Sequence, residues 1–268
     1  DGSGLSKEIK RNVSIAGGTI HDNYTENATL TTQKGAGIFI RKYEAANNDD
    51  ATAGEANPIP DGGYAALGGA GTITVTASGG TIYNNVTNNG HGGGVHIVNE
   101  FYGGSITSNC NVEVRDAAQI YNNTCYGNGG GVYVQGGNFT MNGGVIGKSG
   151  YPNIANKGNG GGLAVNGGNI TINNGNIDYN QAKFVSGTQG HVGAFYLTGG
   201  VATVTGGMIS HNTADKNGGG FYVNTTGTST TTIKGGANVS YNTAVNGAGA
   251  YINQGTLAVQ DAATSINH

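Results

Sequence analysis

The chain repeats one short motif, an apolar residue followed three positions later by asparagine. After a first interval of 62 residues, the motif recurs every 26 to 38 residues. The pairs are Ile20/Asn23, Ile82/Asn85, Ile120/Asn123, Ile177/Asn180, Ile209/Asn212 and Val239/Asn242, with a degenerate member at Ile146/Ser149. A repeat of this length without helical periodicity is typical of a solenoid, in which each repeat packs against its neighbours.

Two further landmarks accompany each asparagine motif. A glycine-rich corner precedes a short apolar run, as in Gly92-Gly93-Gly94-Val95-His96-Ile97, and a second alternating run such as Ile170-Thr171-Ile172 closes the unit. Successive residues of a strand face opposite sides, so the alternation places one set of side chains inward and the other outward. Each unit is therefore predicted to contain three strands separated by turns.

These features predict an all-β fold, a parallel β-helix of about seven coils with three strands each, and a single domain over residues 1–268. The pattern resembles a right-handed parallel β-helix of the pectin-lyase-like kind. Its Gly-Gly-x-Ile and Ile-x-x-Asn elements are similar to repeats of bacterial polymorphic outer-membrane and autotransporter passenger proteins. In those repeats the first residue of the second element is commonly Phe, whereas here it is Ile or Val. Residues 41–71 lack a strand period and are predicted to form a loop excursion from the first coil.

The repeated asparagines are predicted to be structural. Side chains at equivalent positions of adjacent coils stack, so each amide can donate a hydrogen bond to the next amide carbonyl. Such a ladder satisfies polar groups that a buried turn would otherwise leave unpaired. The predicted ladder consists of Asn23, Asn85, Asn123, Asn180, Asn212 and Asn242.

Composition limits the class of protein and of partner. With 53 Gly, 3 Pro and 10% charged residues, the chain is too glycine-rich for an ordinary globular domain and too periodic for a disordered one. A net charge of −3 without a basic run predicts no nucleic-acid binding. No apolar stretch approaches the roughly 20 residues that span a bilayer. The composition resembles that of an extracellular segment on a bacterial cell surface, and we expect that location.

Groups that could carry out catalysis do not gather in the predicted coils. Glu113, Arg115 and Asp116 form the most charged spot, which we interpret as a solvated surface cluster. His91 and His191 occupy equivalent corner positions three coils apart, so at ~4.8 Å per coil they cannot share a metal ion. We therefore predict no catalytic residue, no metal site and no cofactor.

The two cysteines, Cys110 and Cys125, leave two alternatives open. They lie in neighbouring parts of the repeat, one before a closing strand and the other just after a ladder asparagine. A disulfide across a corner would suit an oxidising compartment, and two separate thiols are equally compatible with the spacing.

Two predicted outward columns are candidate binding surfaces. Aromatic side chains recur on the second strand, where they could stack on sugar rings, form a protein interface or simply stabilise the sheet through cross-strand pairs. This second-strand column consists of Phe39, His96, Tyr133, Tyr196, Tyr222 and Tyr251. The third strand presents a polar stripe that includes Thr74, Thr140 and Thr171 and resembles the ice-binding face of solenoid antifreeze proteins.

We predict a non-catalytic extracellular β-helix, either a surface adhesin segment or a self-associating fibre subunit. Its expected partners are a glycan, a ligand on a host or cell surface, or copies of the chain joined end to end. One alternative is a polysaccharide lyase or glycoside hydrolase of the pectin-lyase-like fold, with charged residues supplied by the 41–71 segment. The other alternative is an ice-binding protein.

Overall fold

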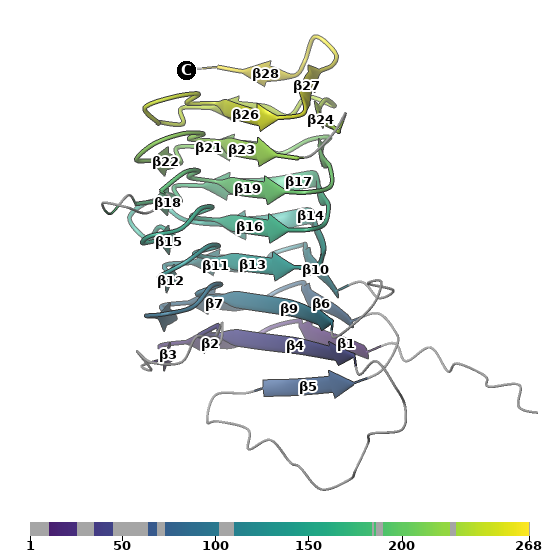
Figure 1. Ribbon diagram of the computed structural model, residues 1–268, viewed down its shortest axis with the longest axis vertical. Coiled ribbons are helices and arrows are strands. Elements are labelled where there is room, and N and C mark those ends of the chain that lie inside the picture. The colour runs from purple at the N-terminus through teal and green to yellow at the C-terminus, as the bar shows by residue number, and fades with distance from the viewer. Residues whose placement is uncertain are drawn as a thin grey trace, which may run out of the picture.

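A computed structural model describes residues 11–25, 35–44, 64–68, 73–101, 110–183, 185, 190–225 and 229–267. Every regular element within these ranges is a strand, and the strands form three parallel sheets that wind about one axis (Figure 1). The predicted parallel β-helix of about seven coils is thus confirmed.

The largest sheet has 14 strands and bends along its length, so that most coils contribute two short strands to it. The first run comprises β1 (Arg11–Ile15), β6 (Ile73–Ala77), β10 (Cys110–Val114), β14 (Gly137–Ile146), β17 (Ile170–Asp178), β20 (Ala202–Val204), β24 (Thr230–Ile233) and β27 (Thr256–Val259). The second run comprises β2 (Thr19–His21), β7 (Thr81–Tyr83), β11 (Gln119–Tyr121), β21 (Met208–Ser210), β25 (Asn238–Ser240) and β28 (Ser265–Ile266). β14 and β17 are long enough to take part in both runs.

The other two sheets complete each coil. The six-stranded sheet comprises β3 (Tyr24–Thr25), β8 (Val86–Thr87), β12 (Thr124–Cys125), β15 (Ile154–Ala155), β18 (Gln181–Ala182) and β22 (Thr213–Ala214). The eight-stranded sheet comprises β5 (Tyr64–Gly68), β4 (Ile38–Glu44), β9 (Val95–Phe101), β13 (Val132–Gln135), β16 (Leu163–Asn166), β19 (Phe195–Thr198), β23 (Phe221–Asn224) and β26 (Ala250–Gln254).

The predicted excursion over 41–71 is wrong at both of its ends. β4 continues through residues 41–44, and β5 pairs with β4 in parallel register, on the edge of β4 opposite to β9. Figure 1 shows β5 below β4, as the outermost strand at that end of the molecule. The rest of the predicted excursion lies outside the described residues.

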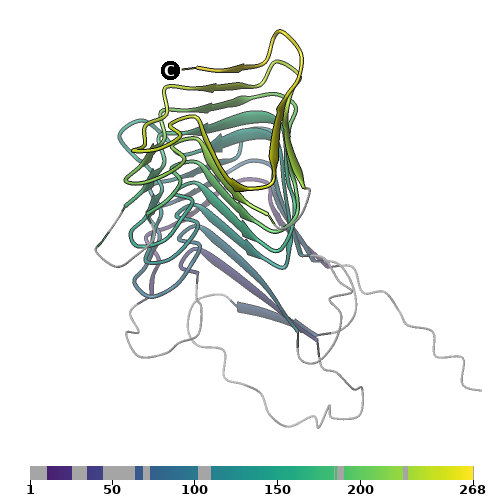
Figure 2. The same ribbon diagram turned by 45° about the horizontal axis from the view of Figure 1, so that its top comes forward.

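Figure 2 shows the coils stacked around one central axis. The core between the three sheets is a continuous column of aliphatic and aromatic side chains. In β17, Ile170 and Ile172 are buried while Thr171 between them faces outward, as the alternation predicted. Phenylalanine takes some inward positions, and the rings of Phe195 and Phe221 stack in adjacent coils at a centroid distance of 5.0 Å. Each coil therefore buries its apolar face mainly against the coils next to it.

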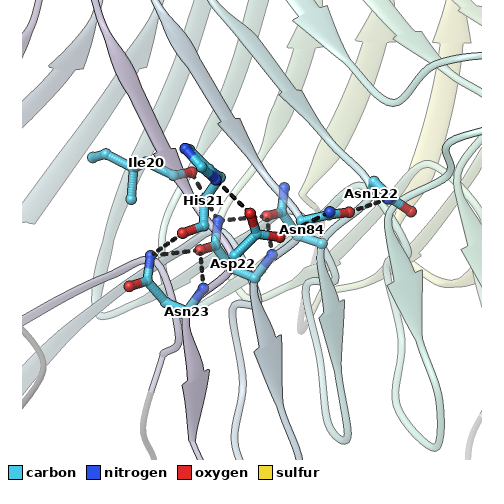
Figure 3. Close-up of polar contacts among 8 residues, drawn as sticks. Ile20, His21, Asp22, Asn23, Asn84 and Asn122 are labelled. Atoms are coloured by element: carbon cyan, nitrogen blue, oxygen red, sulfur yellow. Dashed lines mark hydrogen bonds and ion pairs between the residues drawn. The ribbon is translucent and has the colours of Figure 1, made fainter.

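The six predicted ladder asparagines do form a ladder. Asn23 Nδ2 donates to Asn85 Oδ1 over 2.8 Å, and Asn85 Nδ2 donates in turn to Asn123 Oδ1 over 2.9 Å. The same bond, at 2.9 Å, joins Asn180 to Asn212 and Asn212 to Asn242. Figure 3 shows the ladder at its first member, Asn23.

The degenerate motif member Ser149 does not occupy the ladder position of its coil. The buried position in that coil belongs to Asn153, which accepts a hydrogen bond from Asn123 and donates one to Asn180, both over 2.9 Å. Residues 147–152 form an extra turn, which moves the asparagine four positions along the sequence. We number the coils 1 to 7 by their ladder residues: Asn23, Asn85, Asn123, Asn153, Asn180, Asn212 and Asn242.

Glycine is required where coils stack most closely. A Cβ atom on Gly131 would lie 2.7 Å from the Gly162 carbonyl oxygen, and one on Gly168 would lie 1.6 Å from the Gly137 carbonyl oxygen. Neither distance can accommodate a side chain. The repeated glycines therefore set how closely the corners approach one another.

Both cysteines are buried as thiols, so the disulfide alternative does not hold in this structure. Cys125 Sγ lies 3.0 Å from the Gly127 carbonyl oxygen, and burial raises the pKa of its thiol to about 12. A thiol of this kind is unreactive at neutral pH because the thiolate is the nucleophile.

Candidate binding surfaces

The second-strand column is more covered than predicted. Phe39, His96, Tyr133 and Tyr222 are buried, and Tyr133 is only 3% exposed. The two remaining members, Tyr196 and Tyr251, are partly exposed. The expectation of an open aromatic face is therefore wrong for most of the column, whereas a binding role for these residues remains a prediction.

Side chains from the preceding turns cover this column. The His91 ring stacks on the Tyr133 ring at a centroid distance of 4.6 Å, and the His191 ring lies 5.3 Å from that of Tyr222. Burial raises the pKa of Tyr196 to about 12 and lowers the pKa of His91 to about 4. Ring faces that already contact one another are poorly placed to stack on a sugar.

The turn residues form a second polar ladder, which the sequence analysis identified only at its histidines. Its members are His91, Asn128, Asn159, His191, Asn217 and Asn246. His91 Nδ1 accepts from the Asn128 backbone N–H over 2.8 Å, and His191 Nδ1 lies 2.8 Å from Asn217 Nδ2. These histidines thus take part in hydrogen bonds between coils, and the described residues contain no group of three or more side chains placed to hold a metal ion.

An open, polar concavity lies on the outer face of the 14-stranded sheet, across β6, β10, β14 and β17. Its volume is about 460 Å³. We call it the trough, and it is lined by Thr74, Asn111, Val112, Glu113, Asn138, Thr140, Asn169 and Thr171. The trough coincides with much of the predicted polar stripe.

Strand register explains the shape of the trough. Thr140 pairs with Thr171, Thr171 with Thr203 and Thr203 with Thr232, so these threonines form one row along the axis at about 4.8 Å per coil. The row forms the floor of the trough where Thr140 and Thr171 line it. Hydroxyl groups are therefore presented at regular intervals.

Amide ladders flank this floor on both sides. On one side Asn138 Nδ2 donates to Asn111 Oδ1, and Asn169 Nδ2 donates to Asn138 Oδ1, each over 3.1 Å. On the other side Asn173 Nδ2 donates to Asn142 Oδ1 over 2.8 Å, and Asn142 Nδ2 donates over 3.0 Å to Glu113 Oε1, which belongs to the threonine row because Glu113 pairs with Thr140. The hydrogen bonds between coils hold these side chains in fixed positions before any ligand arrives.

The predicted charged spot borders the trough. Arg115 lies 3.9 Å from the Glu113 carboxylate and 3.3 Å from that of Asp116. Glu113 is the one charged side chain in the lining. Hydroxyl and amide groups both donate and accept hydrogen bonds, so the lining is suited to a polyhydroxylated, largely uncharged ligand.

Asp178, Ser210 and His211 form a cluster at the corner that directly precedes the ladder asparagines. Ser210 Oγ donates to Asp178 Oδ1 over 2.6 Å, and His211 Nδ1 lies 3.0 Å from Ser210 Oγ. The serine lies between the acid and the histidine, whereas in a nucleophilic triad the histidine takes the middle place. Ser210 is also fully buried, so this cluster is not arranged for nucleophilic attack on a substrate.

The same corner carries one aromatic ring per coil, a feature that the sequence analysis missed. In coils 1 to 4 the ring lies two residues before the ladder asparagine, and in coils 5 to 7 it lies one residue before. We call this row the corner ridge; its members are His21, Tyr83, Tyr121, Tyr151, Tyr179, His211 and Tyr241. The detectable signal was an aromatic residue one or two positions before every ladder asparagine.

Rings of the corner ridge stack along the axis. The centroids of His21 and Tyr83 are 4.8 Å apart, and His211 lies 4.7 Å from Tyr179 and 5.2 Å from Tyr241. These three pairs are within 14° of parallel. Their faces cover one another, so the rings present mainly their edges to solvent.

The backbone of the corner ridge is strained in coils 5 to 7. Tyr179, His211 and Tyr241 have φ of 57°, 54° and 54°, in the left-handed region. The equivalent residues of coils 1 to 3 have the same conformation but are the tolerant types Asp22, Asn84 and Asn122, which form a small ladder of their own (Figure 3).

Stacking does not compensate for this strain. The left-handed conformation costs an ordinary residue about 1–2 kcal/mol, whereas a stacked aromatic pair contributes about 0.5–1.5 kcal/mol. Tyr179, His211 and Tyr241 form two stacked pairs, whose stabilisation is smaller than the conformational cost of three left-handed residues. By this measure asparagine would be the more stable choice at these positions.

No family model, curated protein or solved structure matches the chain. Within the ranges that the structure describes, no helix is long and apolar enough to cross a membrane.

Proposed function

We propose that this β-helix is a non-catalytic extracellular adhesion module that binds a largely neutral glycan in the trough. The observation that carries the proposal is the lining itself, in which Thr140 and Thr171 lie beside the amide ladder of Asn111, Asn138 and Asn169, with Glu113 as its one charge. The repeat resembles those of bacterial polymorphic outer-membrane and autotransporter passenger proteins, which supports a bacterial cell surface as its location.

The pre-ordered side chains support binding to a carbohydrate. Asn138 and Asn142 already hydrogen-bond to neighbouring coils, so a ligand would not have to immobilise freely rotating side chains. An elongated concavity parallel to the axis suits a linear chain of sugars, each of which offers hydroxyl groups to the lining. A glycan of high negative charge would be repelled by Glu113.

A non-catalytic role is favoured over a lyase or hydrolase. Hydrolysis of a glycosidic bond requires two carboxyl groups about 5–10 Å apart, on either side of the bond. Among the side chains that line the trough, Glu113 is the one carboxylate, and it bonds to Asn142. Asp178 belongs to the corner cluster rather than to the trough lining.

Ice binding is the second candidate, and it rests on the in-register row of Thr140, Thr171, Thr203 and Thr232. Glu113 disfavours it, because this charged side chain interrupts the threonine row next to Thr140. Thermal hysteresis of the purified protein measures this activity directly. We expect none.

A glycan array probed with the purified protein tests the proposal, followed by calorimetric titration of the best neutral oligosaccharide. The double substitution Thr140→Val and Thr171→Val removes two hydroxyl groups and keeps β-branched side chains. We expect it to weaken binding at least tenfold. Thr232→Val is the matched control, in the same row but outside the lining, and should bind normally. Absence of binding to any glycan, or equal binding by the double variant, would refute the proposal.

A further inference from the structure

The corner ridge has features that the trough does not explain. In coils 5 to 7 aromatic residues occupy a backbone conformation that coils 1 to 3 give to Asp22, Asn84 and Asn122. Their rings are accessible at the surface, and Tyr241 is 61% exposed. A strained conformation kept at three successive coils, on an open surface, indicates that the side chains serve a purpose other than stability.

Positive charge accompanies these rings. The Lys148 ammonium lies 4.9 Å from the Tyr121 ring centroid and 5.8 Å from that of Tyr151. Lys148 belongs to the extra turn of coil 4, so this turn brings a cation to the ridge. Both tyrosine rings and the lysine are therefore available together to a ligand outside the corner.

The hydrogen bonds of His211 fix the orientation of its ring. Ser210 Oγ–H donates to Asp178, so His211 Nδ1–H must donate to Ser210 Oγ. Nε2 is the ring nitrogen outside this chain of hydrogen bonds, and it can accept a hydrogen bond from a sugar hydroxyl. The neighbouring rings of Tyr179 and Tyr241 hold the imidazole between them.

Negative charge is almost absent from the same surface. In each coil the ridge involves the two residues directly before the ladder asparagine. In coils 3 to 7 these residues are Tyr121, Asn122, Tyr151, Pro152, Asp178, Tyr179, Ser210, His211, Ser240 and Tyr241. Asp178 is the one carboxylate in this set, and it is 8% exposed and hydrogen-bonded to Ser210. An anion approaching these positions thus meets little repulsion from the ridge.

We propose that the corner ridge from Tyr121 to Tyr241 is a second binding site, for a linear acidic polysaccharide that lies along the solenoid axis. The phenol groups of Tyr179 and Tyr241 donate hydrogen bonds to its carboxylate or sulfate groups. Lys148 pairs with one of its charges, and His211 Nε2 accepts a hydrogen bond from one of its hydroxyl groups. The facing sides of the Tyr179, His211 and Tyr241 rings cover one another, which favours hydrogen bonds from their edges to acidic groups over contact with apolar sugar faces.

Binding of immobilised alginate and dextran sulfate to the whole chain tests this inference, with dextran as the neutral control. We expect either acidic polymer to bind in a salt-sensitive manner, and dextran not to bind through the ridge. The triple substitution Tyr179→Asn, His211→Asn and Tyr241→Asn should weaken this binding at least tenfold. Its Tm should be unchanged or higher, because asparagine suits the left-handed backbone.

Two further variants keep the test decisive if the triple variant does not fold. The pair Tyr179→Phe and Tyr241→Phe retains the stack and removes two hydroxyl donors, and Lys148→Gln removes a charge. Each should weaken binding at least threefold. Binding of the triple variant within twofold of the parent, or undiminished binding by both further variants, would overturn the proposal. Equal affinity for single-stranded DNA would also overturn it, because it would indicate general attraction of polyanions.

Discussion

Asn153 Nδ2 donates to Asn180 Oδ1 over 2.9 Å, although the extra turn 147–152 shifts Asn153 relative to the repeat. The same side chain accepts from Asn123, so the ladder runs without interruption from coil 1 to coil 7. The extra turn projects outward and carries Tyr151 and Lys148, while the buried amide keeps its place. Hydrogen bonding between buried amides is thus a stronger constraint on the fold than spacing along the chain.

Replacing Asn153 with Ala should destabilise the protein by about 2–4 kcal/mol, because the partners of its amide would be left unsatisfied in a buried site. These partners are the Ile120 carbonyl oxygen and the amides of Asn123 and Asn180. Asn169→Ala, in the exposed outer ladder, should cost less than about 1 kcal/mol. Urea denaturation of both variants measures the difference, and equal costs would contradict a special role for the inner ladder.

Gly168→Ala should be strongly destabilising, by about 3 kcal/mol or more, because the new methyl group would lie 1.6 Å from the Gly137 carbonyl oxygen. The coils could accept it only by moving apart. Gly17→Ala is the control, since no atom lies within 4 Å of the position its Cβ would take. Thermal melts should separate the two variants, and a Gly168→Ala protein as stable as Gly17→Ala would show that the corner can open.

Tyr133→Ala should lower stability by about 3–5 kcal/mol, as expected for loss of a buried aromatic ring. Tyr133 is packed against His91 and His96, with ring centroids 4.6 and 5.0 Å away. Tyr251→Ala, in the same column but partly exposed, should cost about 1 kcal/mol. Chemical denaturation of both variants measures the loss of unfolding free energy. A small loss for Tyr133→Ala would mean that the second-strand column is an open surface after all.

Asp178→Asn should change the pH dependence of stability. Burial raises the pKa of the Asp178 carboxyl above its ordinary value of 3.8, so the folded chain binds this proton more tightly than the unfolded chain. Between the two pKa values, the contribution of Asp178 to stability therefore decreases as the pH rises. The variant should lose this decrease and be at least as stable at pH 7. Thermal melts of the parent and the variant between pH 3 and pH 7 measure this pH dependence. A lower Tm of the variant than of the parent at pH 7 would mean that the charged carboxylate is stabilising.

The sequence predicted the architecture because strand alternation and the asparagine repeat are local patterns that recur in every coil. It did not predict the burial of Tyr133, because alternation distinguishes the inner from the outer face but does not reveal that His91 of a turn will cover the outer one. The trough was predicted in part, from Thr140 and Thr171. Its amide ladder depends on hydrogen bonds between coils, such as that from Asn169 to Asn138, which require the register.

The position of β5 affects how molecules could join. In the part of the chain that the structure describes, β5 adds a strand beyond β4 in the eight-stranded sheet, with no counterpart beside β1, β2 or β3. Within the described residues this end is therefore stepped, with the β5 edge one strand spacing, ~4.8 Å, beyond the edges of the other two sheets. An exposed strand edge is where a further strand can add, so a segment that pairs at this end would meet β5 before either of the other two sheets.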